Sequence, residues 1–449
     1  MPFWTFQNIA EVTRGRWLLE PDDLRDDVVG LWHDTRDLQP GQAYLAIKGD
    51  NFDGHDFLNQ AFAAGAALAI VSETPTPNTQ HLTPILKVDD TVKALQDLAC
   101  SYRDELKQGG CTVIGIAGSN GKTTTRHLIH HVLTHAGFMG TQSPKSFNNH
   151  LGVPLTLLQA LPSDDFVACE IGTNHPGEID FLSAIAKPDI AVITSIGEEH
   201  LEFFKTVANV AREEASIMSH VVENGWVMVP IEDWDRHLKK RCAREDLSVA
   251  HGPDVPFLDG VSGMWITYGP HMRSNANLAA ITAMRLGIDE QQIESALHSA
   301  TLPSGRCERM QFSSVTVIHD AYNANPSSTR ASIEMLSWCS GRRVLVFGDM
   351  LELGEHALDA HRSIGIQAET AELDHLVTVG ELAKHAALAI ETMQVDRFDT
   401  WTDATPDDIA DLLEPGDTVL LKASRGMRLE RLIPAIERRF GPRIEESPT

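Results

Sequence analysis

A glycine-containing segment at residues 118–124, Gly-Ser-Asn-Gly-Lys-Thr-Thr, constrains the fold of this chain more than any other stretch. It follows a short apolar, β-prone run at 112–117 and precedes an amphipathic helical pattern. In a strand, loop and helix of this kind, glycines let backbone amides converge on phosphate oxygens, and the helix N-terminus adds partial positive charge. The segment therefore predicts a nucleotide-binding domain built on a parallel α/β sheet.

The side chains of this loop suit ATP and Mg²⁺. Lys122 would reach the β- and γ-phosphates, and the Thr123 hydroxyl would ligate Mg²⁺. Ile116 stands where the general motif has its first glycine, so the loop is a shorter variant. The alternative interpretation is a glycine-rich turn that only joins a strand to a helix. The ATP-binding residues expected in this segment are Gly118, Ser119, Asn120, Gly121, Lys122, Thr123 and Thr124.

The length of 449 residues suggests about three domains. Residues 1–108 contain short strand-like runs separated by polar loops, and they lead into a glycine linker. Buried strands alternate with helical patterns over 109–301, and the same alternation restarts over 302–449. The pattern predicts an α/β protein with three domains at these boundaries, the central one with a mainly parallel sheet.

Composition excludes several classes of function. Lys and Arg number 37 against 63 Asp and Glu, and the resulting net charge of −26 repels nucleic acid and anionic lipid. No apolar stretch reaches the ~18 residues of a membrane span, and the N-terminus does not resemble a signal peptide. The six cysteines are scattered without C-x-x-C spacing, which argues against a zinc site or a secreted disulfide framework. We therefore expect a protein of a reducing compartment, with no nucleic-acid partner and no membrane insertion.

Two residues after buried strands are candidate metal ligands. Glu170 ends the run 166–170, at the edge of the sheet where a Mg²⁺ ligand belongs beside a phosphate loop. An ordinary strand-end carboxylate facing solvent is the alternative. His200 follows the strand that ends at Thr194, and it would ligate metal or orient a carboxylate unless it is a structural loop histidine.

The third block offers polar and cationic residues at similar positions. The segment 320–326 follows a strand and would hydrogen-bond a ribose or an amide through its Asp, Tyr and Asn side chains, unless it is only a capped helix start. Arg306 and the segment 422–425 each follow an apolar stretch and offer cations to anionic ligands. Exposed charges at helix ends are the alternative for both.

Together, these motifs resemble those of the ATP-dependent Mur ligases, most closely the type that adds D-alanyl-D-alanine to UDP-N-acetylmuramoyl-tripeptide. The resemblance runs from about His33 to Glu430. It rests on five motifs in the family's order, at residues 117–125, 147–154, 172–179, 322–326 and 348–354.

The resemblance implies an enzyme whose first domain holds the UDP-sugar, whose central domain binds ATP, and whose third, Rossmann-like domain closes over ATP. Thr35 and Arg36 stand where the family contacts the UDP-sugar, and Thr123, Glu170 and His200 would form the metal site. Arg306 resembles the family's arginine on the transferring phosphate, Asp320 the ribose ligand, and Asn275 an adenine-side asparagine. The remaining substrate contacts implied are Asn148, Asn149, Thr173, Asn174, His175, Tyr322, Asn325, Lys422 and Ser424.

The implied reaction is amide formation through an acyl phosphate. ATP would phosphorylate the terminal carboxylate of the tripeptide, and the amine of D-Ala-D-Ala would displace phosphate. Lys122, Arg306 and Mg²⁺ would stabilise the charge on the transferring group, and domain closure would exclude water. The resemblance also implies a cytoplasmic monomer that makes a peptidoglycan precursor.

Two departures from the family pattern are visible. The family's carbamylated lysine, fourteen residues after the histidine that matches His200, is Glu214 here. We hypothesise that Glu214 supplies the catalytic carboxylate directly, across a gap of roughly 4 Å that water or a helix shift would fill. The second departure is a shortened stretch around 228–270, followed by Met272 where the family often has asparagine, which affects the adenine pocket.

Two other functions remain open at this point. One is another amide ligase of the superfamily, of the Mur or folylpolyglutamate synthase type. The other is a non-catalytic nucleotide-binding protein on the same scaffold, which Glu214 and the shortened stretch would suit.

Overall fold

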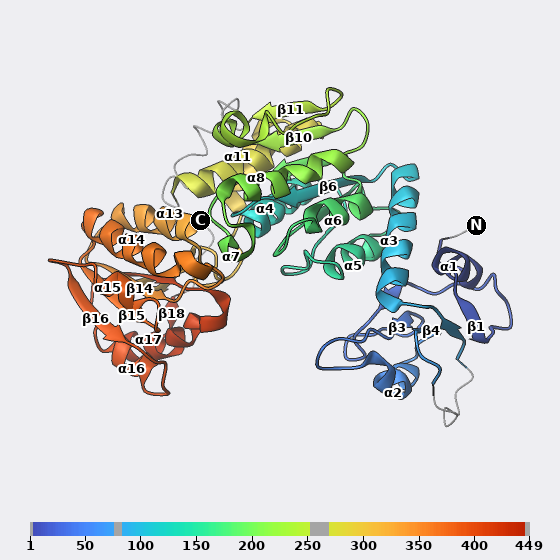
Figure 1. The fold of residues 1–449 in the computed structure, drawn as a ribbon, viewed down its shortest axis with the longest axis horizontal. Helices are drawn as coiled ribbons and strands as arrows, with labels where there is room; N and C mark the ends of the chain where they lie inside the picture. The colour runs from blue at the N-terminus through green and yellow to red at the C-terminus, as the bar shows by residue number, and fades with distance from the viewer. Residues whose placement is uncertain (1–2, 76–82, 252–268, 445–449) are drawn as a thin grey trace.

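The computed structural model describes residues 3–75, 83–251 and 269–444, which form three β-sheets in chain order. The sheet of the N-terminal part and that of the C-terminal part lie at opposite ends of the molecule, with the central sheet between them (Figure 1). The predicted α/β class is confirmed. Among the described helices, none is long and apolar enough to cross a bilayer.

The first sheet has the order β1-β5-β4-β3-β2, and only β1 is antiparallel to its neighbour. One face packs against α1 and α3, and the other against α2, because successive strand residues alternate between the faces. The strands are β1 (Arg16–Leu19), β2 (Leu31–Trp32), β3 (Ala43–Leu45), β4 (Leu68–Val71) and β5 (Ile85–Lys87). The helices are α1 (Phe6–Thr13), η1 (Gly54–Phe57), α2 (Leu58–Ala63) and α3 (Thr91–Gln108).

The central sheet is wholly parallel, with the order β11-β10-β9-β6-β8-β7. Helices α4 and α11 cover one face, while α3, α5 and α6 cover the other. The strands are β6 (Thr112–Ala117), β7 (Gly140–Gln142), β8 (Phe166–Glu170), β9 (Ile190–Ile193), β10 (Trp226–Val229) and β11 (Ser248–His251). The helices are α4 (Lys122–His135), α5 (Gly152–Gln159), α6 (Glu178–Ala186), α7 (Leu201–Phe204), α8 (Val207–Ala215), η2 (Ser216–His220), α9 (Ile231–Asp233), η3 (Trp234–Leu238), α11 (Pro270–Arg285) and α12 (Glu290–Ser299).

The third sheet has the order β16-β15-β14-β17-β13-β12-β18, and β12 is antiparallel to both of its neighbours. Helices α13 and α14 cover one face, and α16 and α17 the other. The strands are β12 (Glu308–Phe312), β13 (Val315–His319), β14 (Arg343–Gly348), β15 (His375–Val379), β16 (Gln394–Phe398), β17 (Thr418–Lys422) and β18 (Arg443–Ile444). The helices are α13 (Pro326–Ser337), η5 (Gly354–His356), α14 (Ala357–Thr370), α15 (Lys384–Ala387), α16 (Thr405–Ala410), η6 (Arg425–Met427), η7 (Leu429–Leu432) and α17 (Ile433–Phe440).

The central and third sheets turn the carboxyl ends of their strands toward one cavity of about 750 Å³. The loops after β6, β8 and β9 line it from the central sheet, and those after β13, β14 and β17 from the third. Ligands of open α/β sheets bind at this edge, because loops from several strands and helix N-termini meet there.

Helix α3 belongs to the cores of both the first and the central sheet. Its Arg103, only 1% exposed, donates from Nε to the Ala186 carbonyl at 2.9 Å. Its Nη2 donates to the Lys187 carbonyl at 2.8 Å and to Asp189 Oδ2 at 2.6 Å. Asp189 Oδ2 also accepts the backbone amide of Val113 on β6, at 2.9 Å. The guanidinium therefore fastens α3 to the edge from which β6 and β9 start.

Arg103→Ala is expected to lower the free energy of unfolding by about 3 kcal/mol, because it removes the cation that pairs with Asp189 and leaves two carbonyls without their side-chain donor. The measurement is the midpoint of urea unfolding, with Lys107→Ala, an exposed position on the same helix, as control. Equal midpoints for the two variants would contradict the role given to Arg103.

Candidate functional site

The phosphate loop requires glycine at two positions. Gly118 has φ +118°, and a Cβ there would lie 2.4 Å from Thr194 Oγ1. Gly121 has φ +88°, and a Cβ there would lie 2.3 Å from Asn275 Oδ1. Only glycine combines a left-handed backbone with such close neighbours. Helix α4 begins directly after the loop, so its N-terminus faces the cavity.

Lys122 lies among carboxylates at the start of α4. Its Nζ donates to the Gly118 carbonyl at 2.5 Å and lies 3.7 Å from Glu199 Oε2. Burial lowers its pKa, but the carboxylates of Glu199, Glu214 and Glu170 outweigh that effect and leave the pKa above its ordinary value. The ammonium therefore stays charged at neutral pH.

Thr123 and Glu170 lie in direct contact next to Lys122. The Thr123 hydroxyl donates to Glu170 Oε2 at 2.8 Å, and Asn148 Nδ2 donates to Glu170 Oε1 at 2.9 Å. Arg306 Nη2, from the third sheet's side, donates to Thr123 Oγ1 at 2.7 Å. A hydroxyl and a buried carboxylate are hard oxygen ligands, which fit Mg²⁺.

The structure identifies no group of three or more His, Cys, Asp or Glu side chains among the described residues that could hold a metal by itself. Mg²⁺ ordinarily keeps few protein ligands and takes the rest from water and substrate phosphates. Thr123 and Glu170, placed beside the phosphate loop, suit that mode of binding.

His200 lies where the loop after β9 meets the loop after β14. Its Nδ1 is 2.6 Å from Glu352 Oε2, and its Nε2 is 3.9 Å from Glu199 Oε2. Both loops line the cavity. The Glu352 carboxylate, which comes from the C-terminal part of the chain, thus orients His200. The second ring nitrogen of His200 points toward Glu199, the carboxylate next to Lys122.

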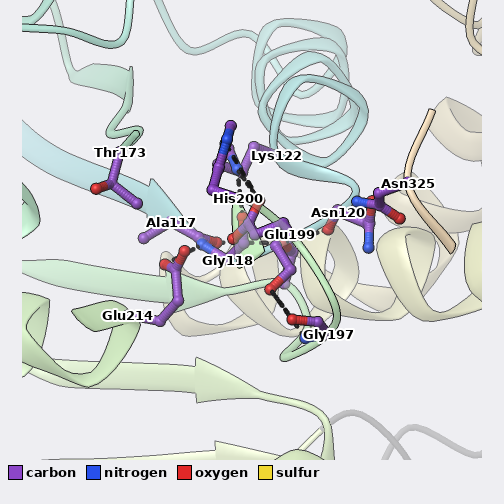
Figure 2. Close-up of polar contacts among 12 residues, drawn as sticks. Ala117, Gly118, Asn120, Lys122, Thr173, Gly197, Glu199, His200, Glu214 and Asn325 are labelled. Carbon is purple, nitrogen blue, oxygen red and sulfur yellow. Dashed lines mark hydrogen bonds and ion pairs between the residues drawn. The ribbon is translucent and has the colours of Figure 1, made fainter. Parts of the chain in front are cut away.

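The side chain of Glu214 contacts the backbone of the phosphate loop. Its side chain is fully buried, and Oε2 accepts the backbone amide of Gly118 at 2.6 Å (Figure 2). Burial, and then the charge of Glu199, raise its pKa well above the usual value. Glu214 is not among the residues that line the cavity. The Glu214 carboxyl group therefore bonds to the backbone of the phosphate loop and does not face the cavity.

Asp320 and Lys422 pair with each other. Lys422 Nζ donates to Asp320 Oδ2 at 2.6 Å, and Ser332 Oγ donates to the same oxygen at 2.7 Å. Burial raises the pKa of Asp320, but Lys422 outweighs it and holds the pKa below its usual range. Both residues line the cavity, so Lys422 reaches it as half of an ion pair and not as the free cation expected from sequence.

Tyr322 lies between two arginines of the third unit. The guanidinium carbon of Arg306 is 4.1 Å from the ring centroid, and that of Arg425 is 5.6 Å away. The Tyr322 hydroxyl hydrogen-bonds Ser146 across the cavity. Both guanidinium groups therefore lie within reach of an attractive cation–π interaction with the ring.

Asn120 joins the phosphate loop to the start of α13. Its Oδ1 accepts from Asn325 Nδ2 at 2.8 Å, and its Nδ2 donates to Ser327 Oγ at 2.9 Å (Figure 2 labels both asparagines). Asn325 also caps α13, accepting the amide of Ser328 at 2.8 Å. The capped helix start is therefore present at Asn325, which also lies in the cavity wall.

The structure brings together most of the predicted site residues. Lining the cavity are Asn148 and Asn149 from the loop after β7, and Thr173, Asn174 and His175 from the loop after β8.

Ser424 and Asn275 also line the cavity, whereas Thr35 and Arg36 do not. Arg36 lies in the first sheet's unit and pairs with Asp34 at 2.5 Å. Of the shortened stretch 228–270, residues 252–268 lie outside the described part of the chain.

Sequence reasoning gave no role to several residues that the structure places in the cavity wall: Glu199, Asp233, His271 and Glu352. A signal was present for two of them. Glu199 adjoins His200, and Glu352 lies within the motif at 348–354. The others come from segments whose pattern carries no chemical signature.

His271 provides a pH test of this part of the structure. Burial lowers its pKa to about 4, with Asp320 opposing and Lys422 reinforcing the effect. An unfolded chain would bind a proton at this histidine near pH 6.5, so the folded state loses stability as the pH falls from about 6.5 to 4. The loss is expected to reach about 3 kcal/mol.

His271→Gln should remove this contribution. Urea unfolding at pH 7 and pH 4.5 is expected to show a smaller fall in stability for His271→Gln than for the unsubstituted protein. An unchanged pH dependence would show that His271 is not buried in its neutral form.

Comparison with known proteins agrees with this geometry. Residues 27–103 match the catalytic domain of the Mur ligase family, 116–251 its middle domain, and 305–425 its glutamate ligase domain. The UDP-N-acetylmuramoyl-tripeptide--D-alanyl-D-alanine ligase of Bacillus subtilis is 34% identical, over 96% of this chain and 97% of that protein.

Solved structures extend the likeness to three dimensions. MurF from Acinetobacter baumannii is similar with a TM-score of 0.83 and 28% identity, covering 97% of this chain and 99% of that one. MurF from Thermotoga maritima, in complex with ADP, has a TM-score of 0.74 and 25% identity, covering 92% and 97%. With relatives this similar over nearly their whole length, the chain belongs to the Mur ligase family.

Proposed function

We propose that this protein is an ATP-dependent ligase that joins D-alanyl-D-alanine to UDP-N-acetylmuramoyl-tripeptide, a step in peptidoglycan precursor synthesis. The observation that carries the proposal is the contact between Arg306 and Thr123, which brings a cation of the third unit onto the phosphate loop. Relatives that bear this activity in their names match over the full length of the chain.

The chemistry suits the residues around the phosphate loop. The donor carboxylate attacks the γ-phosphorus of ATP, and ADP leaves with the electrons of the broken bond. The acceptor amine then attacks the acyl carbon, loses a proton, and expels phosphate. Lys122, Arg306 and the N-terminus of α4 would hold the phosphoryl oxygens throughout. Bound Mg²⁺, held by Thr123 and Glu170, would neutralise phosphate charge, and His200 would lie beside it.

We assign one ligand to each of the three domains, with the domain boundaries expected from the sequence. Residues 1–108 would hold the UDP end of the donor through Thr35 and Arg36, residues 109–301 would bind ATP, and residues 302–449 would bring the acceptor. The placement of Thr35 and Arg36 away from the cavity suits a long donor that spans two units. The proposed protein is a cytoplasmic monomer without a nucleic-acid partner.

The substrate contacts are assigned from the cavity wall. Asn148, Asn149, Thr173, Asn174 and His175 would face the donor peptide.

Tyr322, Asn325, Lys422 and Ser424 would face the acceptor. Asn275 and Asp320 would face the nucleoside, with Asp320 held by Lys422.

Phosphate release from ATP and Mg²⁺ tests the function. Release is expected only with both UDP-N-acetylmuramoyl-tripeptide and D-Ala-D-Ala, and Lys122→Met is expected to lower kcat by about 10³ because it removes a cation from the transferring group. Activity with meso-diaminopimelate but not with D-Ala-D-Ala would identify another amide ligase. ATP binding without release under any of these conditions would identify a non-catalytic protein.

We propose that Glu214 makes this enzyme independent of bicarbonate, by holding the phosphate loop with its own buried carboxyl group at the position of the family's carbamylated lysine. The bond to Gly118 and the burial of the side chain support this role. Glu214→Ala is expected to lower kcat by about 10² and to weaken Mg²⁺ binding, since the loop amide and the lysine each lose a partner.

The control for Glu214 is Glu223→Ala, an exposed glutamate that should leave kcat unchanged. Assays in bicarbonate-free buffer should give full activity of the unsubstituted enzyme. Stimulation by added bicarbonate, or unchanged Mg²⁺ affinity in Glu214→Ala, would overturn this role.

A further inference from the structure

Helix α8 carries two adjacent glutamates that are both buried, Glu213 at 7% and Glu214 at 0% exposure. Successive residues of a helix are turned by about 100°, so the two side chains leave α8 in different directions. A buried carboxylate is costly unless it is hydrogen-bonded. Each of these residues must therefore have a fixed partner, and the two partners are different loops.

The Glu213 carboxylate accepts hydrogen bonds from backbone amides at the start of helix α6. Its Oε2 accepts the amide of Gly177 at 2.8 Å, and its Oε1 accepts the amide of Ile179 at 2.9 Å. The Thr173 hydroxyl lies 3.4 Å from Oε1. These amides lack partners within their own helix, so a carboxylate at this helix N-terminus is held strongly.

A second carboxylate occupies the other amides of the same loop. Glu178 Oε2 accepts from the amides of Asn174 at 2.6 Å and His175 at 3.0 Å. With Glu213, this uses the four amides of Asn174, His175, Gly177 and Ile179. Because these amides are occupied, the 173–179 loop can contact a ligand in the cavity only through its side chains. The conformation of the loop depends on the carboxylates of Glu213 and Glu178.

We propose that Glu213 is a positioning residue, which fixes the 173–179 loop at a set distance from the phosphate loop through α8. Glu213 holds the loop after β8, and its neighbour Glu214 holds Gly118 in the loop after β6. The two loops leave the neighbouring parallel strands β6 and β8, and both line the cavity (Figure 2 labels Thr173 on one loop and Gly118, bonded to Glu214, on the other). Glu213 does not line the cavity itself, so it acts on the donor only through the loop. The inference rests on the proposed function, in which this loop contacts the donor peptide.

Glu213→Gln is the direct test, because the amide keeps the size of the side chain but turns one acceptor into a donor facing a backbone N–H. The KM for UDP-N-acetylmuramoyl-tripeptide is expected to rise about tenfold, while the KM for ATP stays within twofold. Glu214→Gln should show the opposite preference, with the ATP side affected more. Glu223→Gln is the matched control and should change neither KM.

Hydrogen exchange supplies a readout independent of turnover. In Glu213→Gln the amides of Gly177 and Ile179 should exchange faster, while the peptide that contains Gly118 keeps its protection. Glu213→Asp retains the charge on a shorter side chain and should give an intermediate KM for the donor.

The outcomes separate the two proposals. If the unsubstituted enzyme releases no phosphate with both substrates, the proposed function fails. If that enzyme is active and Glu213→Gln changes the two KM values equally or not at all, the positioning role fails. If Glu213→Gln and Glu213→Asp both fail to fold, Glu213 serves the fold as a whole and the positioning role is overturned.

Discussion

A lysine ammonium held among carboxylates at the N-terminus of helix α4 is the feature around which the rest of the site is organised. Lys122 must stay charged to serve phosphate, and a buried ammonium stays charged only if carboxylates surround it. The carboxylates come from a strand, a loop and a helix, at Glu170, Glu199 and Glu214 respectively. The phosphate loop therefore cannot be assembled from its own residues alone. Its charge state depends on β8, on the loop after β9, and on α8.

The same dependence extends across the cavity to the third sheet. Asn120 is bonded to Asn325 and Ser327, His200 to Glu352, and Thr123 to Arg306. Asn120, Thr123 and His200 follow the carboxyl ends of the parallel strands β6 and β9, and their partners lie between residues 306 and 352. Two parallel sheets placed with these ends facing each other can hold a reactive intermediate between them, away from water.

The sequence predicted what depends on neighbours along the chain. The strand, glycine loop and helix around Lys122, and the α/β class, follow from local pattern, and the structure agrees with both. The sequence did not predict that the Glu214 side chain bonds to the Gly118 amide, because the two residues are 96 positions apart. Nor did the sequence reveal that the charge of Lys422 is balanced by an ion pair with Asp320, 102 residues away. A motif fixes the residue and its element, whereas the direction of its side chain depends on contacts that form only in the folded chain.

Helix α3 has a further consequence for the donor. It spans 18 residues, about 27 Å, and it is part of two cores at once. The first and central sheets are thus joined by a rigid rod instead of a flexible linker. If the nucleotide end of the donor is held on the first sheet, the rod works as a ruler that sets how much peptide fits before the chain reaches the phosphate loop. A donor with one amino acid fewer would leave its carboxylate short of the γ-phosphate, so selection by length would be built into the frame of the protein as well as into the residues of its pocket.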